Sequence, residues 1–281
     1  MSDESPPAGA LRLARVAGVP VYLDRTWLFL GAFVAWTGWQ SGQNLGDGTA
    51  TALAFAGWTV VGILVAVLGH EVAHAVAARL LGFRVHRIVA TLWGGHTAYD
   101  GTGTTPGRAA AIAVAGPLTN LALAALGWVA TVTLAWPASE FAWSFTILNL
   151  LLGVFNLLPG LPLDGGQLVQ SLVWGVSGRR DLGLVVAGWC GRVLAVVVAL
   201  VLVVRPLAEG RSDLLGVGIG LVMAWILWSG ATAALKRAPL ERLLLRVRPE
   251  DVMDPVVVVP ALTPVGELVG IGRRVVALDE R

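Results

Sequence analysis

The sequence predicts an all-α polytopic membrane protein with about six transmembrane helices and a small membrane-associated β-hairpin or strand region between helices 2 and 3. Hydrophobic residues make up 56% of the chain and charged residues only 14%, a composition typical of integral membrane proteins. With 281 residues, the chain has room for several spans of about 20 residues each and a small additional segment. Apolar runs separated by glycine, proline and polar residues supply the spans, and a stretch of alternating residues supplies the strands.

The predicted spans follow one another between residues 26 and 235. The first is short, and it either stands alone or extends into the preceding segment, 16–23. This reading divides the chain into an N-terminal segment, 1–25, a membrane domain, 26–235, and a C-terminal tail, 236–281. The limits of the six spans are 26–40, 50–81, 108–136, 141–158, 182–204 and 214–235.

The segment between the second and third spans has the pattern of strands. Residues 83–91 alternate between apolar and polar side chains, and Gly94 and Gly95 then precede a second extended run. This pattern predicts a β-hairpin. Such backbone cannot face lipid, so it must lie at the membrane interface or line a cavity. There it could hold an extended peptide by strand addition, although a plain connector explains the sequence equally well.

The arginines predict the orientation of the protein in the membrane. Arginines precede the first span, lie between the second and third spans, and recur in the tail, whereas the loops at 41–49 and 137–140 contain no lysine or arginine. Arg205 and Arg211 are the exceptions. Because positive residues accumulate in cytoplasmic loops, we expect a multi-pass protein of the cell membrane with both termini in the cytoplasm.

A metal-binding motif lies inside the second predicted span. His70-Glu71-Val72-Ala73-His74 interrupts an otherwise apolar run. Two histidines four residues apart lie on one helical face and can bind one zinc ion, and Glu71 lies beside that face, where it can activate water. Both histidines fall in the later part of the span, nearer the cytoplasmic side. A purely structural role in helix association is the alternative, but three titratable groups exceed what such contacts need.

Asp164 is the best candidate for a third ligand. Two prolines and three glycines between Pro159 and Gly166 break the fourth span where this carboxylate occurs. Freed backbone groups and an acid at that depth require a cavity and a partner. One zinc ion per chain would also balance the charges of Asp164 and Glu71, which makes the whole cluster cheaper to bury than its members.

These motifs together resemble the site-2 protease family of intramembrane zinc metalloproteases. The resemblance rests on the His70–His74 motif, on Asn156 to Gly165 and on Gly116-Pro117-Leu118-Thr119-Asn120, and it covers roughly residues 50–170. It implies that His70, His74 and Asp164 bind zinc and that Glu71 is the general base. It also implies a transmembrane protein substrate, such as a membrane-tethered transcription regulator or an anti-sigma factor, in the lipid bilayer.

Three further residues are candidates for substrate contact. Asn120 and Asn156 each carry an amide that can donate to a carbonyl or a developing oxyanion, and interhelical hydrogen bonding competes with that role. Gly95 lies in the predicted hairpin. His96, which follows it, is better explained as an interfacial histidine.

The tail resembles the opening of a CBS domain. This resemblance begins at Val247 and ends near Leu268, and it covers less than one full repeat. It matches the branch of the family that carries a C-terminal CBS module, in which an adenosine nucleotide would be the ligand. Because the segment is so short, a simple strand appendage is the alternative.

Other functions are weighed against the same residues. A metal or proton transporter could use the His-Glu-His cluster, but residues 50–68 offer few polar groups for an ion path. A membrane metalloprotease with a glutamate as third ligand lacks a suitable candidate, since Glu140 and Glu209 lie in outer loops. An inactive relative would most simply have lost Glu71, which is present.

Composition limits the remaining classes of function. The formal net charge of +2 gives no reason to expect nucleic acid as a partner. Cys190 is the single cysteine, so no intrachain disulfide and no cysteine zinc site can form. The polar, acidic start of the chain is unlike a signal peptide. A homo-oligomer is compatible with the sequence.

Overall fold

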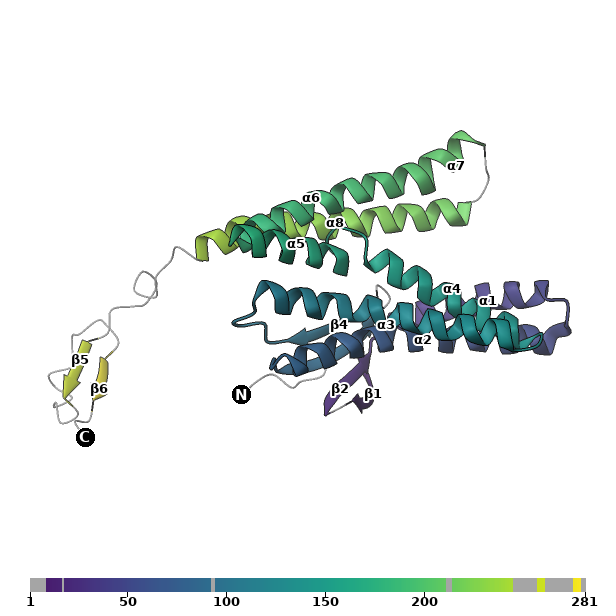
Figure 1. Cartoon of the computed structure of the whole chain (residues 1–281), viewed down its shortest axis with the longest axis horizontal. Helices are drawn as coiled ribbons and strands as arrows, with labels where there is room; N and C mark the ends of the chain where they lie inside the picture. Colours follow the sequence, from purple (N-terminus) through teal and green to yellow (C-terminus); the bar gives the residue numbers. More distant parts are fainter. Residues whose placement is uncertain are drawn as a thin grey trace. The chain divides into compact units, whose positions relative to one another are not determined.

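The computed structural model describes residues 9–16, 18–91, 94–210 and 214–244 and two further strands in the tail (Figure 1). The chain divides into two compact units, Met1–Ala238 and Pro239–Arg281. The helices are α1 Trp27–Asn44, α2 Gly48–Leu80, α3 Pro106–Thr133, α4 Ala138–Asn156, α5 Asp164–Ser177, α6 Arg180–Ala199, the π-helix η1 Leu200–Val204, α7 Arg205–Ala208 and α8 Leu214–Leu244. The strands are β1 Leu11–Val16, β2 Val19–Leu23, β3 Val85–Thr91, β4 Gly94–Tyr99, β5 Val257–Pro260 and β6 Val275–Leu278.

Within the described residues, five helices are long and apolar enough to cross a membrane. They are α2, α3, α4, the continuous run from α6 through α7, Arg180–Ala208, and α8. The protein is therefore a multi-pass membrane protein. The predicted first span forms α1, which is not among the five. Four polar residues close this helix at Gln40, Ser41, Gln43 and Asn44, and they reduce its apolar length. The count of six spans is thus not confirmed.

A four-stranded sheet with the order β1-β2-β3-β4 lies against the membrane helices. β3 and β4 are antiparallel, which confirms the hairpin predicted between the second and third spans. β1 and β2 form a second hairpin, and β2 pairs in parallel with β3. The possible extension of the first span into 16–23 is therefore wrong. That short segment lies largely in β2, where Val19 and Val21 are buried against Ile88 and against Ala75 of α2.

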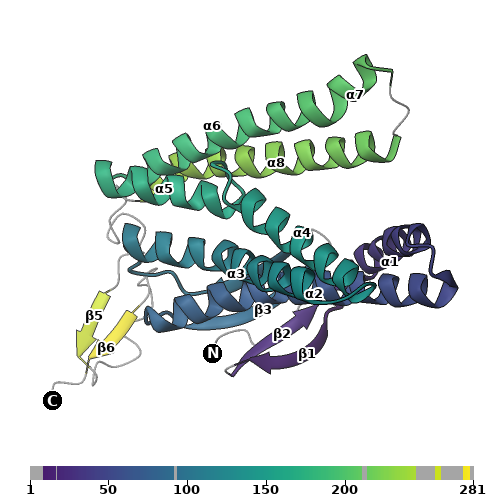
Figure 2. The same ribbon diagram turned by 45° about the vertical axis from the view of Figure 1, so that its right-hand side comes forward.

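This packing fixes β4 beside the metal-binding motif. Val19, Val21 and Ile88 hold one face of the sheet on the same turns of α2 that carry the histidines. In Figure 2 the strands β1, β2 and β3 lie beside the helical layer that contains α2 and α3. As a result, β4 passes Glu71, and the Thr97 hydroxyl donates to the Glu71 backbone oxygen over 3.0 Å.

The glycine-rich break after α4 turns the chain into α5. Gly165 and Gly166 pack directly on the backbone of residues 157–161, where a Cβ atom on either would clash. The break was predicted, but the helix that follows it, Asp164–Ser177, was not. Its first residues, Asp164, Gly165 and Gly166, belong to the glycine-rich segment that predicts a break. Glycine has a low helix propensity, and propensity does not predict a helix that tertiary packing stabilises.

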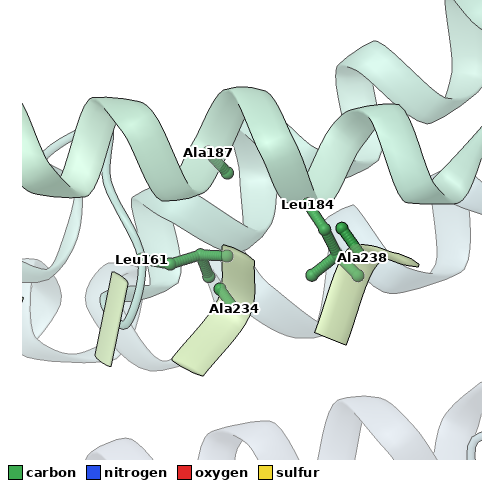
Figure 3. Close-up of a cluster of buried hydrophobic side chains, with 5 residues drawn as sticks. All are labelled: Leu161, Leu184, Ala187, Ala234 and Ala238. Atoms are coloured by element: carbon green, nitrogen blue, oxygen red, sulfur yellow. The ribbon is translucent and has the colours of Figure 1, made fainter. Parts of the chain in front are cut away.

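A cluster of buried leucine and alanine side chains packs this break against α6 and α8 (Figure 3). Leu161 packs with Leu184 and Ala187 of α6 and with Ala234 and Ala238 of α8. The Leu161 amide also donates to the Ala187 carbonyl over 3.1 Å. Alanine side chains let helices approach closely. The loop that precedes Asp164 is therefore packed tightly between α6 and α8, which fixes the position of Asp164.

The predicted CBS-like segment, 247–268, lies outside the described residues except for β5. β5 pairs in parallel with β6.

Candidate metal centre

Three side-chain atoms from two helices converge on one point. His70 Nε2 lies 3.0 Å from His74 Nε2, and Asp164 Oδ2 lies 3.0 Å and 3.3 Å from these two nitrogens. All three residues are at most 8% exposed. Ligands at zinc distances of about 2.0–2.1 Å in a tetrahedron are separated by roughly 3.3 Å. The three atoms therefore have the spacing of one face of a zinc coordination sphere.

The second nitrogen of each histidine ring is already committed. His70 Nδ1 lies 2.6 Å from Asn120 Oδ1, and His74 Nδ1 lies 2.7 Å from the Ile112 carbonyl oxygen. Both partners are acceptors, so each Nδ1 carries the proton and donates it. In the neutral ring the lone pair then lies on Nε2, the atom that faces Asp164. Metal-binding histidines are usually oriented by such a bond.

The convergence of acceptors favours a bound cation. Asp164 Oδ2 is buried and receives no hydrogen bond from any described residue, while the other carboxylate oxygen accepts from Gln167 Nε2 over 3.3 Å. Two imidazole lone pairs and an unsatisfied carboxylate oxygen repel one another when nothing lies between them. A divalent metal ion satisfies all three, and the residues fit it.

Gly116 of α3 provides the space beside the two rings. A Cβ atom at this position would lie 2.7 Å from His70 Cδ2 and closer still to the Nε2 atoms of both histidines. No side chain can therefore occupy this position without displacing a ring. This contact gives a steric reason for glycine in the third-span motif.

Glu71 lies on the same turn of α2, between the histidines and the sheet. It is 5% exposed, and its Oε2 accepts a hydrogen bond from Thr97 Oγ1 of β4 over 2.9 Å. Gly95 faces the same carboxyl group, since a Cβ atom there would lie 2.7 Å from Glu71 Oε1. Thr97 thus fixes one oxygen, and the absence of a side chain on Gly95 leaves room for the other.

A buried amide network stands behind His70. Asn120 and Asn149 are both fully buried. Asn120 Nδ2 donates to the Ala66 carbonyl over 3.1 Å and to Asn149 Oδ1 over 3.0 Å, which leaves its oxygen for His70. The orientation of the His70 ring therefore depends on two asparagines from α3 and α4.

We expect the change Asn149→Ala to lower the free energy of unfolding by about 1–2 kcal/mol. It removes an acceptor of the Asn120 amide and leaves that buried group partly unsatisfied. The measurement is reversible unfolding in detergent micelles. The control is Asn156→Ala, because the Asn156 amide bonds only the Leu152 carbonyl of its own helix among the described residues and its loss should cost less. Equal losses in the two variants would contradict the network.

The predicted residues thus fall into two groups. Six of them lie together at the site: His70, Glu71, His74, Asp164, Asn120 and Gly95. The seventh, Asn156, donates a hydrogen bond to the Leu152 carbonyl within α4. Three contributors were missed: Thr97, Asn149 and Gln167. The spacing of Gln167, three residues after Asp164 on a helix, could have indicated it, but no sequence signal indicates the other two.

Comparisons with known proteins agree on one family. A family model described as Peptidase family M50 matches residues 58–136 and 131–200. Rip3 of Mycobacterium tuberculosis, whose name describes a zinc metalloprotease, is 38% identical over 258 residues, 87% of this chain. A relative from Synechocystis, also named as a zinc metalloprotease, is 29% identical over 87% of this chain. The chain spans 63% and 65% of the length of these two relatives.

A solved structure shares the fold. The site-2 protease from Methanocaldococcus jannaschii superposes with a TM-score of 0.54, covering 80% of this chain and 95% of that one, at 22% identity. None of these comparisons supports the transporter alternative.

Proposed function

Because the chain belongs to peptidase family M50, we propose that it is an intramembrane zinc endopeptidase of the site-2 type. It would hydrolyse peptide bonds in or near the transmembrane segments of other membrane proteins. The observation that carries this proposal is the convergence of His70 Nε2, His74 Nε2 and Asp164 Oδ2 beside Glu71. Both histidines and Glu71 lie on α2, a helix long and apolar enough to span a membrane.

His70, His74 and Asp164 would hold one zinc ion per chain. When bound, zinc supplies a Lewis acid that polarises the scissile carbonyl and lowers the pKa of water toward about 7. Asp164 contributes one negative charge to the site, and the neutral histidines contribute donor nitrogens. Gln167 binds the Asp164 oxygen that faces away from the histidines and so keeps Oδ2 turned toward them.

Glu71 would move the proton. As general base it takes a proton from the attacking water and passes it to the leaving amine. The Thr97 hydroxyl bonds Glu71 Oε2, so the free oxygen, Oε1, is the one that exchanges the proton. Burial of the carboxyl group keeps bulk water from competing with the substrate for this atom.

Asn120 would position His70 in this reaction. Its oxygen accepts from His70 Nδ1 and its amide is engaged by Ala66 and Asn149. This role differs from the substrate contact expected from sequence. Gly95 and Asn156 remain candidates for substrate contact. For Asn156 this is a prediction from sequence alone.

The substrate must lose its helical structure locally before it can react. A helical segment hides its carbonyls in hydrogen bonds, so segments with helix-breaking residues should be preferred. We place both termini and the active site toward the cytoplasm, because of the distribution of the arginines. We also propose the division into an N-terminal segment, 1–25, a membrane domain, 26–235, and a tail, 236–281. Membership in the branch with a C-terminal CBS module, nucleotide binding by the tail and self-association stay predictions from sequence.

The test is metal content and cleavage in the purified chain. We expect one zinc ion per chain in liposomes, cleavage of a transmembrane substrate, loss of cleavage on treatment with a membrane-permeant chelator and recovery on addition of zinc. Cleavage that survives removal of the metal, or a chain that binds no metal at all, would overturn the proposal.

We expect Gly95→Ala to reduce cleavage by about 10–100-fold while zinc stays bound. The new methyl group would displace the Glu71 carboxyl group, since the three atoms nearest to it all belong to Glu71 and none to a candidate metal ligand. Initial rates and zinc content of the same preparation give the answer. Gly57→Ala is the control, because Gly57 is exposed in α2 and a Cβ atom there meets nothing within 4 Å. Equal activity in the two variants would show that β4 does not shape the site.

A further inference from the structure

An arginine lies in the middle of a membrane span and has no role in the proposed chemistry. Arg192 belongs to α6, within the continuous run Arg180–Ala208 that is long and apolar enough to cross a membrane. Arg180 precedes it by about 18 Å along the helix, and Arg205 follows it by about 20 Å, at 1.5 Å per residue. The hydrocarbon core is about 30 Å thick. When the apolar stretch between these two arginines spans that core, Arg192 lies near its centre.

The neighbours of Arg192 hold its side chain at this depth. Its guanidinium lies over the Trp189 ring, 4.9 Å from the ring centre, and over the Trp228 ring of α8, 5.0 Å from that centre. Nη2 also donates to Thr232 Oγ1 of α8 over 3.4 Å. Because α6 and α8 run side by side (Figure 1), these contacts direct the side chain sideways from one helix to the other. The arginine therefore does not reach along α6 toward the membrane surface, as a snorkelling side chain does.

The positive charge of Arg192 has no counter-ion in the described part of the chain. Its Nε atom is buried and has no hydrogen-bond partner there, and its contacts are two uncharged rings and one hydroxyl group. An arginine does not lose its proton in a protein. The rings offset part of the cost of a charge in hydrocarbon, but charged side chains at this depth are almost always paired. The arginine is thus a site that lacks its partner.

The arginine lies at a surface that faces lipid. Trp189 and Trp228 are 55% and 47% exposed, and Arg192 is itself partly exposed. Val193 and Val196 continue the same face of α6 and are exposed as well. Lipid chains can cover the apolar side chains of this face, but they cannot balance the charge at its centre.

A second copy of this chain does not supply the missing charge. Among the described spans, Glu71 is the only acidic residue that lies away from a span end, and it is buried beside the candidate metal ligands. Lipid phosphates lie at the membrane surface, about 15 Å from the bilayer centre. The remaining source of an anion at this depth is a carboxylate on a transmembrane helix of another protein.

We propose that the face of α6 and α8 around Arg192 is a docking site for a transmembrane helix of another membrane protein that carries an aspartate or glutamate near the middle of its span. The carboxylate pairs with Arg192, and the Trp189 and Trp228 rings pack against the apolar side chains of the docked helix. Each charge is costly alone in hydrocarbon, so the two select one another. This inference goes beyond the proposed peptidase function, since the docking face contains neither Glu71 nor a candidate metal ligand.

The experiment measures association of the full chain with model transmembrane helices in liposomes, by energy transfer between fluorophores on the two partners. The chain carries Glu71→Gln, so that no cleavage alters the signal. The model helices are leucine spans with aspartate, asparagine or leucine at the central position, and one span with aspartate two turns nearer its end. A close interfacial charge pair corresponds to at least about tenfold in affinity. We expect the central-aspartate helix to bind more tightly than each of the others by at least about that factor.

Variants of the arginine test its role directly. Arg192→Leu should bind all four helices equally, whereas Arg192→Lys, which keeps the charge, should still prefer the central aspartate. The matched control is Arg205→Leu, because it removes an arginine of the same helical run that pairs with Glu209. It should keep the full preference.

Two results would overturn the docking site. One is a central-aspartate helix that binds no better than the leucine helix, a comparison that does not depend on how any Arg192 variant folds. The other is a preference for aspartate that survives in folded Arg192→Leu. Energy transfer between two labelled copies of this chain, lost in Arg192→Leu and without any preference for aspartate helices, would assign the face to self-association instead. None of these results depends on whether the chain cleaves a peptide.

Discussion

Replacement of Glu71 by glutamine is expected to reduce peptide cleavage by about 10³-fold while zinc stays bound. Glutamine has nearly the same shape, and its amide oxygen can still accept the hydrogen bond that Thr97 donates to Oε2. What it lacks is the ability to take a proton. General-base catalysis typically contributes about 10²–10⁴-fold, so the loss should fall on kcat rather than on KM.

The measurement compares initial rates, zinc content and thermal unfolding of wild type and the variant in liposomes. Glu140→Gln is the matched control, because it makes the same change in the first turn of α4, away from the metal ligands. It should keep full cleavage. Zinc retained with unchanged cleavage in Glu71→Gln would remove Glu71 from the proposed mechanism, and zinc lost from that variant would mean that the carboxyl group contributes to metal binding.

The three candidate metal ligands could be identified from the sequence because their signals are local or chemically costly. His70 and His74 are one helical turn apart in sequence, and Asp164 is a carboxylate in a broken apolar segment. Each demands an explanation at membrane depth. The structure brings these three together within hydrogen-bonding distance, as the sequence indicated.

The surrounding residues could not be predicted, because their roles depend on packing between distant segments. Asn149 reaches His70 only through Asn120, and Thr97 reaches Glu71 only because β2 and β3 dock the sheet on α2. An asparagine or threonine in an apolar run can have several structural roles, and the sequence alone does not distinguish between them. The strands β1 and β2 could not be predicted either. Their sequences are short, and they look like the segment that leads into the first transmembrane span.

The helix α5 shows why local patterns failed at one point. Glycines 165 and 166 are poor helix formers, so the sequence predicts only a break in the fourth span at this point. In the structure they are required for a different reason, since a Cβ atom at either position would clash with the backbone of residues 157–161. Close packing selected glycine there, and the helix is stabilised by its neighbours rather than by propensity.

Gly116→Ala is expected to weaken zinc binding strongly, and to reduce cleavage with it, without unfolding the protein. The added methyl group would overlap both histidine Nε2 atoms, the atoms that hold the lone pairs. The rings cannot rotate away cheaply, because His70 Nδ1 and His74 Nδ1 are bonded to Asn120 and to the Ile112 carbonyl. We expect zinc affinity to fall by at least about 100-fold, the upper range for losses of residues that merely orient a ligand.

The stability of the metal-free protein separates this effect from misfolding. Alanine favours a helix over glycine by about 1 kcal/mol, which offsets part of the strain, so the helical signal and unfolding temperature of the metal-free forms should stay close. Gly107→Ala is the control, since it lies in the first turn of the same helix and a Cβ atom there meets nothing within 4 Å. It should bind zinc normally. Full zinc content in Gly116→Ala would mean that the ion is not held where the two Nε2 atoms meet, because that space would then be filled by carbon.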